Sequence, residues 1–296
     1  MALSHKKTQK IQKVLIFYNN YRGLNLSKFL SNKGFEVFNI VTRKFLNKRI
    51  INKIDENKLK IINNLKSKHF FNFIYKKKFD LIISAGFPHI FSKKFFNISK
   101  YGIINLHAGK LPKYRGGSPL VWQILNDEKK IGISVIKINN KLDQGKIVCK
   151  SEFENLKKDN IMNIQKKANK LFLNLTLKAI KNILQNKPMI KQPSSKSYFH
   201  QRYDKDALIN FNQKNLEVFN LVRSQSTPYK GAFFFIKRKK YRLLECKMTN
   251  FNPKIKNGEL FKLGNEKQIF IKCKSKSIEI KKIVPEINFS NKIKIL

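Results

Sequence analysis

The alternation of strand-like and helix-like segments over the first two thirds of the sequence most restricts the fold. Residues 14–18 form a short apolar run that ends in turn formers, and apolar residues then recur at helical spacing from Leu24 to Leu30. Further runs with the length and composition of strands follow at residues 35–41, 80–84, 101–106 and 131–138. Strands that alternate with helices predict a mostly parallel α/β sheet.

Three local signals predict where helices begin and end. Gly34 suits the C-terminus of the first helix, because glycine adopts the left-handed conformation there at little cost. Ser118 followed by Pro119 is typical of an N-cap and a first helical residue. Apolar residues then step by three and four from Ile161 to Ile183, which predicts one long amphipathic helix that closes the first domain.

A break in periodicity predicts two domains. Pro188 and the turn formers that follow it interrupt both helical and strand patterns. We therefore expect a first domain of residues 1–187, a linker of residues 188–203 and a smaller domain of residues 204–296.

The smaller domain is expected to consist mainly of strands. One helix is predicted near residues 216–223. Short β-type runs follow at residues 233–236, 241–244, 268–272 and 278–284. Glycine and proline between these runs predict a small barrel or a curled sheet.

Length and composition favour a folded protein outside the membrane. The 296 residues suffice for about two domains, and 42% of them are hydrophobic, so a large core can be buried. No apolar run is long enough to span a bilayer, and the basic start, Met1–Lys7, does not lead into a secretory signal. We expect a cytoplasmic protein without a membrane partner. Cys149, Cys246 and Cys273 lack the spacing of a zinc or disulfide framework, so buried or inert thiols are expected.

The net charge of +45 has two explanations. An excess of 63 Lys and Arg over 18 Asp and Glu favours a polyanionic partner. However, only eight of the 63 are arginine, and the abundant Lys, Asn, Ile and Phe share A/T-rich codons, so genome composition explains much of the lysine content. Under either explanation, anionic ligands are attracted and their association weakens with salt.

Polar side chains gather where one predicted strand ends. Asn105 and His107 point to the same face because side chains alternate along a strand, and the carboxyl ends of strands are where open α/β sheets place ligands. Asp143 follows another strand, which would bring a carboxylate to the same edge. Each residue alone has an ordinary structural explanation as a turn former or a buried polar group. Together they predict a site.

The same segments resemble a known family. Asn105-x-His107, the run from Leu111 to Gly116 that reads Leu-Pro-x-Tyr-Arg-Gly, and Asp143-x-Gly145 are similar in type, order and spacing to the hallmark of formyltransferases that use 10-formyltetrahydrofolate. The similarity is strong over about residues 80–150 and extends more weakly into the rest of the chain.

The resemblance implies a fold, a donor and a set of roles. The fold would be α/β, with a mostly parallel Rossmann-like sheet and a second, β-rich, OB-like barrel. Asn105, His107 and Asp143 take the places of the catalytic triad. The places that grip the folate pterin, mainly through backbone groups, fall on Gly86, Phe87, Pro88, His89 and Ile90 and on Asn139, Asn140, Lys141 and Leu142. The formyl donor would be 10-formyltetrahydrofolate, and no metal is required.

These residue types suit formyl transfer to a primary amine. The Asn105 amide and a protonated His107 can donate hydrogen bonds to the oxyanion that forms on the formyl oxygen. Histidine titrates near neutrality, so His107 can also carry the proton that the amine loses. Asp143 beside the imidazole would favour the protonated ring and order a water.

The resemblance leaves two acceptors, and the sequence favours a nucleotide-linked amino sugar over methionine on initiator tRNA. Enzymes of the tRNA type usually carry a Gly-Thr-Pro-x-Phe-Ala segment and a basic wedge loop, and residues 18–23 and 41–49 match neither. Residues 115–122 are more similar to the sugar enzymes. Basic runs such as 237–240 could follow a tRNA backbone, so the tRNA remains the alternative. A binding module without catalysis is disfavoured because all three triad positions are filled.

Overall fold

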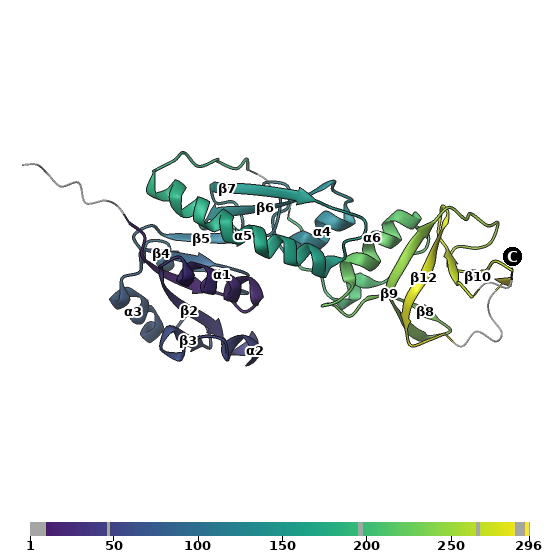
Figure 1. Ribbon diagram of the computed structural model, residues 1–296, viewed down its shortest axis with the longest axis horizontal. Coiled ribbons are helices and arrows are strands. Elements are labelled where there is room, and N and C mark those ends of the chain that lie inside the picture. Colours follow the sequence, from purple (N-terminus) through teal and green to yellow (C-terminus); the bar gives the residue numbers. More distant parts are fainter. Residues whose placement is uncertain (1–9, 46–47, 195–197, 265–266, 288–293, 296) are drawn as a thin grey trace, which may run out of the picture. The chain divides into compact units, whose positions relative to one another are not determined.

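The chain forms two compact units. The structure, a computed structural model, describes residues 10–45, 48–194, 198–264, 267–287 and 294–295 (Figure 1). The first unit comprises residues 1–116, 132–152 and 167–198. The second unit comprises residues 117–131, 153–166 and 199–296. The basic start of the chain and residues 46–47 of the expected wedge-loop position lie outside the described residues.

A seven-stranded sheet with the order β3-β2-β1-β4-β5-β6-β7 forms the centre of the first unit. Its strands are Lys13–Phe17 (β1), Glu36–Thr42 (β2), Leu59–Ile62 (β3), Leu81–Ser84 (β4), Ile103–His107 (β5), Lys130–Lys137 (β6) and Ile147–Glu154 (β7). Every pairing from β3 to β5 is parallel, whereas β6 pairs with β5 in the antiparallel direction. The prediction of a mostly parallel α/β sheet is confirmed.

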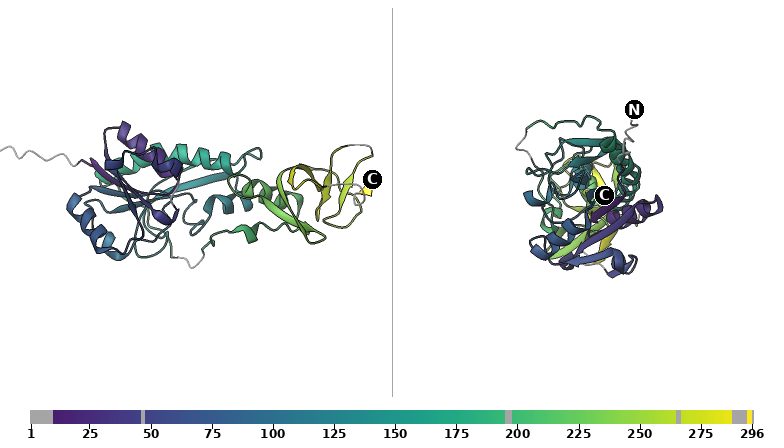
Figure 2. Two further views of the ribbon diagram at one scale, coloured as in Figure 1. Left: turned by 90° about the horizontal axis from the view of Figure 1, so that it is seen from below. Right: turned by 90° about the vertical axis from the view of Figure 1, so that its left-hand side faces the viewer.

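Helices cover both faces of this sheet. Helices α1 (Tyr21–Asn32) and α5 (Ile161–Leu184) lie over one face, and α3 (Lys68–Lys77) lies over the other (Figure 2, left). The Arg22 guanidinium joins the first two, because it donates to Asn169 Oδ1 at 3.0 Å and stacks over the Phe172 ring at 4.9 Å. A short helix, α2, spans Lys48–Ile51. The long helix begins where its periodicity predicted.

The central strands β1, β4 and β5 are mostly apolar because both faces of the sheet are covered, and the polar residues of β4 and β5 lie at their carboxyl ends. Leu15 and Phe17 of β1 and Ile82 of β4 pack with Phe70 and Ile74 of α3 in one buried cluster. Burying a side chain of this size stabilises the fold by roughly 1.5–3 kcal/mol. This core fixes β4 and the neighbouring β5, whose carboxyl ends carry the candidate site.

The second unit contains a six-stranded sheet with the order β13-β10-β11-β12-β9-β8. Its strands are Ala232–Ile236 (β8), Lys239–Thr249 (β9), Leu260–Lys262 (β10), Phe270–Lys272 (β11), Ser277–Val284 (β12) and Lys294–Ile295 (β13). All pairings are antiparallel except that of β10 with β13. Helix α6 (Asn215–Gln225) packs on this sheet, and α4 (Pro119–Leu125) contacts α6. The predicted β-rich second domain is confirmed.

Ser118 corrects one expectation. Pro119 begins α4 as predicted, but Ser118 has φ 47° and its side chain does not cap the helix. Instead its hydroxyl accepts hydrogen bonds from Gln201 Nε2 at 2.8 Å and from the Arg202 backbone N–H at 3.1 Å. Ser118 is therefore the N-cap residue as predicted, but its side chain makes no capping hydrogen bond, because a contact distant in sequence occupies the hydroxyl.

The cysteines are free and buried, as predicted. Burial raises the pKa of the Cys149 and Cys273 thiols to about 12 and also raises the pKa of Cys246. Across the described ranges, no helix has the length and apolar character needed to cross a membrane.

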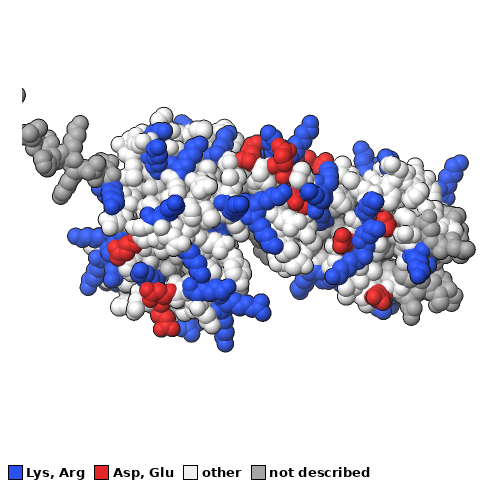
Figure 3. All heavy atoms as spheres, in the orientation of Figure 1, with Lys and Arg blue, Asp and Glu red and all other residues white. Residues whose placement is uncertain are grey.

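One face of the molecule is rich in basic side chains. On the face that Figure 3 shows, Lys and Arg side chains are spread widely, and Asp and Glu form a few small groups among them.

Candidate active site

Asn105 and His107 lie at the carboxyl end of β5. They are two residues apart on one strand and so share a face, with Ser84 of β4 beside Asn105 and Ser134 of β6 beside His107. His107 is 6% exposed, and Asn105 is half-buried. Within the described ranges the Asn105 side-chain amide makes no hydrogen bond, so both its donor and its acceptor are available to a ligand.

Both ring nitrogens of His107 have partners. Nε2 lies 2.6 Å from the Tyr114 carbonyl oxygen, and Nδ1 lies 3.6 Å from Asp143 Oδ1. Because a carbonyl oxygen only accepts, Nε2 must carry a hydrogen. Nδ1 then faces a carboxylate, which is favourable when Nδ1 is protonated as well. The two contacts therefore hold the ring in one orientation at the end of β5.

Asp143 is held in a fixed position beside this ring. The Gly116 backbone N–H donates to Asp143 Oδ2 at 2.9 Å, and the side chain is 9% exposed. The Asp143 backbone has φ 51°, in the left-handed region that few non-glycine residues adopt. Strain of this kind costs about 1–3 kcal/mol and persists where the surroundings determine the geometry, often at functional sites.

The chain brings Asp143 to His107 by a different path from the one that the sequence predicted. The β5–β6 register sets Lys137 opposite Ile104 and Ser134 opposite His107, so β6 ends near the amino end of β5. Asp143 does reach His107, as expected, but not directly from the end of β6, because β6 is antiparallel to β5. The loop after β6 instead turns back, and Gly145 permits this turn, since an added Cβ would lie 1.5 Å from the Lys137 carbonyl oxygen.

The histidine contact depends on a close approach at Gly109. A Cβ at this position would lie 2.5 Å from both His107 Nε2 and the Tyr114 carbonyl oxygen. The buried Ser134 hydroxyl supports the same loop, because it donates to the Gly109 carbonyl at 2.9 Å and accepts from the Leu111 N–H at 3.3 Å. Gly109 and Ser134 were not singled out from the sequence, because their contacts run through the backbone.

The first predicted folate loop follows β4, next to β5. Asn20 Nδ2 donates to the Gly86 carbonyl at 3.3 Å, and Gly86 has φ +73°. The Phe87 ring packs on Phe17 with centroids 5.1 Å apart and on His89 at 5.3 Å. Pro88 lies between these rings in sequence, and Ile90 is 79% exposed. The loop is anchored to the core at its start and reaches the surface at its end.

The second predicted folate loop leads directly into Asp143. Asn139 Oδ1 accepts from the Lys141 N–H at 3.0 Å, and the Leu142 carbonyl accepts from the Tyr198 hydroxyl at 3.0 Å. Asn139, Asn140, Lys141 and Leu142 are all exposed. Their backbone is therefore accessible, while their folate contacts stay a prediction.

Two family models match the sequence. Residues 28–180 match the model described as "Formyl transferase", and residues 203–291 match "Formyl transferase, C-terminal domain". The chain belongs to the formyl transferase family. The resemblance of its motifs to that family is confirmed.

The relatives of this chain are named as two kinds of protein. The bifunctional polymyxin resistance protein ArnA of Wigglesworthia glossinidia brevipalpis is 32% identical over 283 residues, which are 90% of this chain and 42% of that protein. The methionyl-tRNA formyltransferase of Malacoplasma penetrans is 32% identical over 231 residues, which are 77% of this chain and 69% of that protein. The chain thus spans less than half the length of the ArnA relative.

A solved structure shares the fold. The N-formyltransferase from Helicobacter canadensis, in complex with folinic acid and dTDP-3-aminofucose, has a TM-score of 0.64 at 20% identity. The similarity covers 92% of this chain and 98% of the other.

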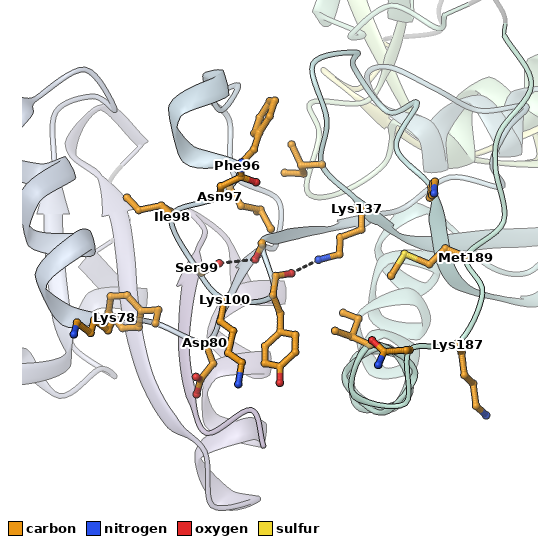
Figure 4. Close-up of a pocket in the computed structure, with 18 of the residues that line it drawn as sticks. Lys78, Asp80, Phe96, Asn97, Ile98, Ser99, Lys100, Lys137, Lys187 and Met189 are labelled. Carbon is orange, nitrogen blue, oxygen red and sulfur yellow. Dashed lines mark hydrogen bonds between the residues drawn. The ribbon is translucent and has the colours of Figure 1, made fainter. Parts of the chain in front are cut away.

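The first unit also contains a large cavity, which lies away from His107 and Asp143. It has a volume of about 1190 Å³ and opens near the amino end of β5, whereas His107 is the last residue of that strand (Figure 4). Burial lowers the pKa of Lys137, whose ammonium donates to the Tyr101 carbonyl, and Asp80 accepts from two backbone N–H groups. The lysines that line the cavity are expected from the composition, because 63 of the 296 residues of the chain are basic. The cavity is therefore not the candidate active site.

Potential metal ligands are not clustered in this part of the molecule. The described residues hold no group of three or more His, Cys, Asp or Glu side chains arranged to bind a metal ion.

Proposed function

We propose that this formyl transferase moves the formyl group of 10-formyltetrahydrofolate to the primary amine of a nucleotide-linked amino sugar. The observation that carries the transfer chemistry is the contact of His107 with Asp143, at 3.6 Å, on the same strand end as the unbonded Asn105 amide. Further support comes from the Gly116 backbone N–H, which holds the Asp143 carboxylate in place.

The residues present fit a flat folate ring. Phe87 is half-buried, with its ring packed against Phe17 and Phe91, so part of an aromatic surface stays open beside the backbone of residues 86–90. The exposed backbone of residues 139–142 leads into Asp143. We assign both loops to the donor, which would supply a formyl group attached to a nitrogen.

Three side chains would divide the work of the transfer. The Asn105 amide would donate a hydrogen bond to the formyl oxygen as negative charge develops on it. The acceptor amine forms the new C–N bond and loses one proton, while the bond to the donor nitrogen breaks and that nitrogen gains one proton. His107 and Asp143 would move this proton from the amine to the leaving nitrogen, so no proton is consumed overall.

Support for a sugar acceptor comes from the sequence and from the relatives. The segment after β1 lacks the Gly-Thr-Pro-x-Phe-Ala pattern of tRNA enzymes. The Helicobacter canadensis structure, which contains dTDP-3-aminofucose, aligns with 92% of this chain.

Initiator tRNA is the second candidate acceptor. It is favoured by a relative at 32% identity that is named a methionyl-tRNA formyltransferase, and by the net charge of +45. A tRNA would contact the protein through many phosphates, so its affinity would fall steeply with salt.

The acceptor can be tested directly. The purified protein is incubated with 10-formyltetrahydrofolate and either nucleotide-linked 3-amino and 4-amino sugars or methionyl initiator tRNA, and formyl transfer is scored by mass spectrometry. We expect a formylated sugar, with a Michaelis constant that rises only several-fold between low and moderate salt, because the ligand carries just a diphosphate. Formylation of the tRNA alone, with a steep loss of affinity in salt, would overturn the sugar assignment. A His107→Ala variant serves as the inactive control.

A further inference from the structure

A buried glutamine lies next to the candidate site without belonging to its motif. Gln192 follows α5 in the first unit and is 9% exposed. Its Oε1 accepts hydrogen bonds from Arg115 Nε at 3.2 Å and from Arg115 Nη2 at 3.0 Å. Its Nε2 donates to the Asp143 carbonyl at 2.9 Å and to the Gly145 carbonyl at 2.7 Å. One amide thus makes four hydrogen bonds to two separate loops.

Arg115 depends on this amide because it is fully buried, at 0% exposed. Besides Gln192, the guanidinium donates only to the Pro193 carbonyl, at 2.8 Å, and its Nη1 has no partner in the described structure. No carboxylate in the described chain pairs with it. A buried cation held by neutral groups is costly, so its position is determined by these few hydrogen bonds.

The neighbours of Arg115 hold the two proton-carrying side chains. Immediately before it, the Tyr114 carbonyl contacts His107 Nε2 at 2.6 Å. Immediately after it, the Gly116 N–H donates to Asp143 Oδ2 at 2.9 Å. A displacement of Arg115 would therefore move both backbone groups, and a displacement of the Asp143 backbone would move the carboxylate itself.

We propose that Gln192 is a positioning residue that locks the His107 ring and the Asp143 carboxylate into one geometry. The inference rests on the proposed function for its effect on catalysis. Gln192 acts through both loops at once: Oε1 fixes the arginine between the two backbone contacts, and Nε2 fixes the backbone of the residue that carries the carboxylate. The amide can do both because its oxygen accepts and its nitrogen donates, whereas a carboxylate only accepts.

This requirement predicts that glutamate cannot replace the glutamine. Gln192→Glu keeps an acceptor for Arg115 and adds an ion pair to it. However, its second oxygen would face the Asp143 and Gly145 carbonyls, which only accept. A role limited to satisfying Arg115 predicts that this variant works as well as the wild type. A positioning role predicts that it fails.

The experiment compares Gln192→Glu and Gln192→Leu with Gln185→Leu, an exposed glutamine beyond the end of α5 that serves as the matched control. We expect kcat for formyl transfer to fall at least tenfold in both Gln192 variants. The KM for 10-formyltetrahydrofolate should stay within about twofold, and the control should be unchanged. Circular dichroism and thermal unfolding establish that each variant is folded.

A second readout does not depend on turnover. The ¹⁵N chemical shifts of the His107 ring, recorded at a fixed pH in the wild type and in Gln192→Glu, report its protonation and hydrogen bonding. We expect these shifts to change in Gln192→Glu and not in Gln185→Leu. Unchanged ring shifts, or a wild-type kcat in folded Gln192→Glu, would overturn the proposal. If the wild type formylates no acceptor, the proposed function fails, and the ring shifts still decide the role of Gln192.

Discussion

Replacing Asp143 by asparagine tests the electrostatic role of the carboxylate with little change in shape. Asparagine keeps an oxygen that can accept from the Gly116 N–H, which now donates to Asp143 Oδ2 at 2.9 Å. What disappears is the negative charge 3.6 Å from His107 Nδ1. The variant therefore separates charge from position.

The size of the effect follows from that distance. Two unit charges 3.6 Å apart interact by about 1 kcal/mol in water and by about 4–5 kcal/mol at an effective dielectric constant of 20. The side chains are 6% and 9% exposed, so the larger value is the relevant limit, and the dipole of the asparagine amide retains part of it. A loss of about 2–4 kcal/mol lowers kcat by roughly 30-fold to 1000-fold.

The assay is steady-state formyl transfer at saturating donor between pH 6 and pH 9. Binding of the folate donor, followed by calorimetry, should be nearly unchanged. A variant whose kcat stays within threefold of the wild type would show that Asp143 only shapes its turn.

Three further predictions use other contacts. His107→Ala should lower kcat by about 100-fold or more with circular dichroism unchanged, since a positioned acid–base group contributes about 10²–10⁴-fold; near-native turnover would remove His107 from the reaction. Gly145→Ala should lower both the melting temperature and kcat, because the added Cβ would lie 1.5 Å from the Lys137 carbonyl oxygen, and a native melting temperature would contradict this. The Arg242 guanidinium, which donates to both Asp204 oxygens at 2.8 Å, holds the pKa of Asp204 below its usual range. Asp204→Asn should therefore lower the free energy of unfolding at pH 7 by about 0.2–1 kcal/mol, a modest value because the pair is partly exposed. The difference should vanish as acid protonates Asp204 in the wild type. If urea unfolding shows an equal loss at pH 7 and at acidic pH, the ion pair is not the cause.

The elements that sequence patterns predict are those with long, uninterrupted apolar runs. Strands β1, β4 and β5 and helix α5 were predicted to within two or three residues because they are buried on several sides. Strand β3, at the edge of its sheet, and the two- and three-residue strands β13 and β10 give no such signal. Helix α3 was not predicted, and its apolar segment, residues 70–75, is short and flanked by lysines.

The direction of a strand cannot be predicted from its hydrophobic pattern, and this limits what the sequence says about the site. The same apolar run at residues 131–138 fits a parallel or an antiparallel strand, so the reversal of β6 and the return path of Asp143 could not be read from it. The burial of Gln192 was hidden for a related reason. It stands between turn formers, and its partners Arg115 and Asp143 are distant in sequence.

Three consecutive residues, Tyr114, Arg115 and Gly116, each contribute a different chemical group: a carbonyl, a guanidinium and an N–H. The number of residues between His107 and Gly116 is therefore itself part of the machinery. A point substitution at the exposed Lys113 leaves this count intact. A one-residue insertion or deletion in the same loop would shift these three groups by one position, so that each would meet the wrong partner. This loop should therefore tolerate substitutions but not a change in length.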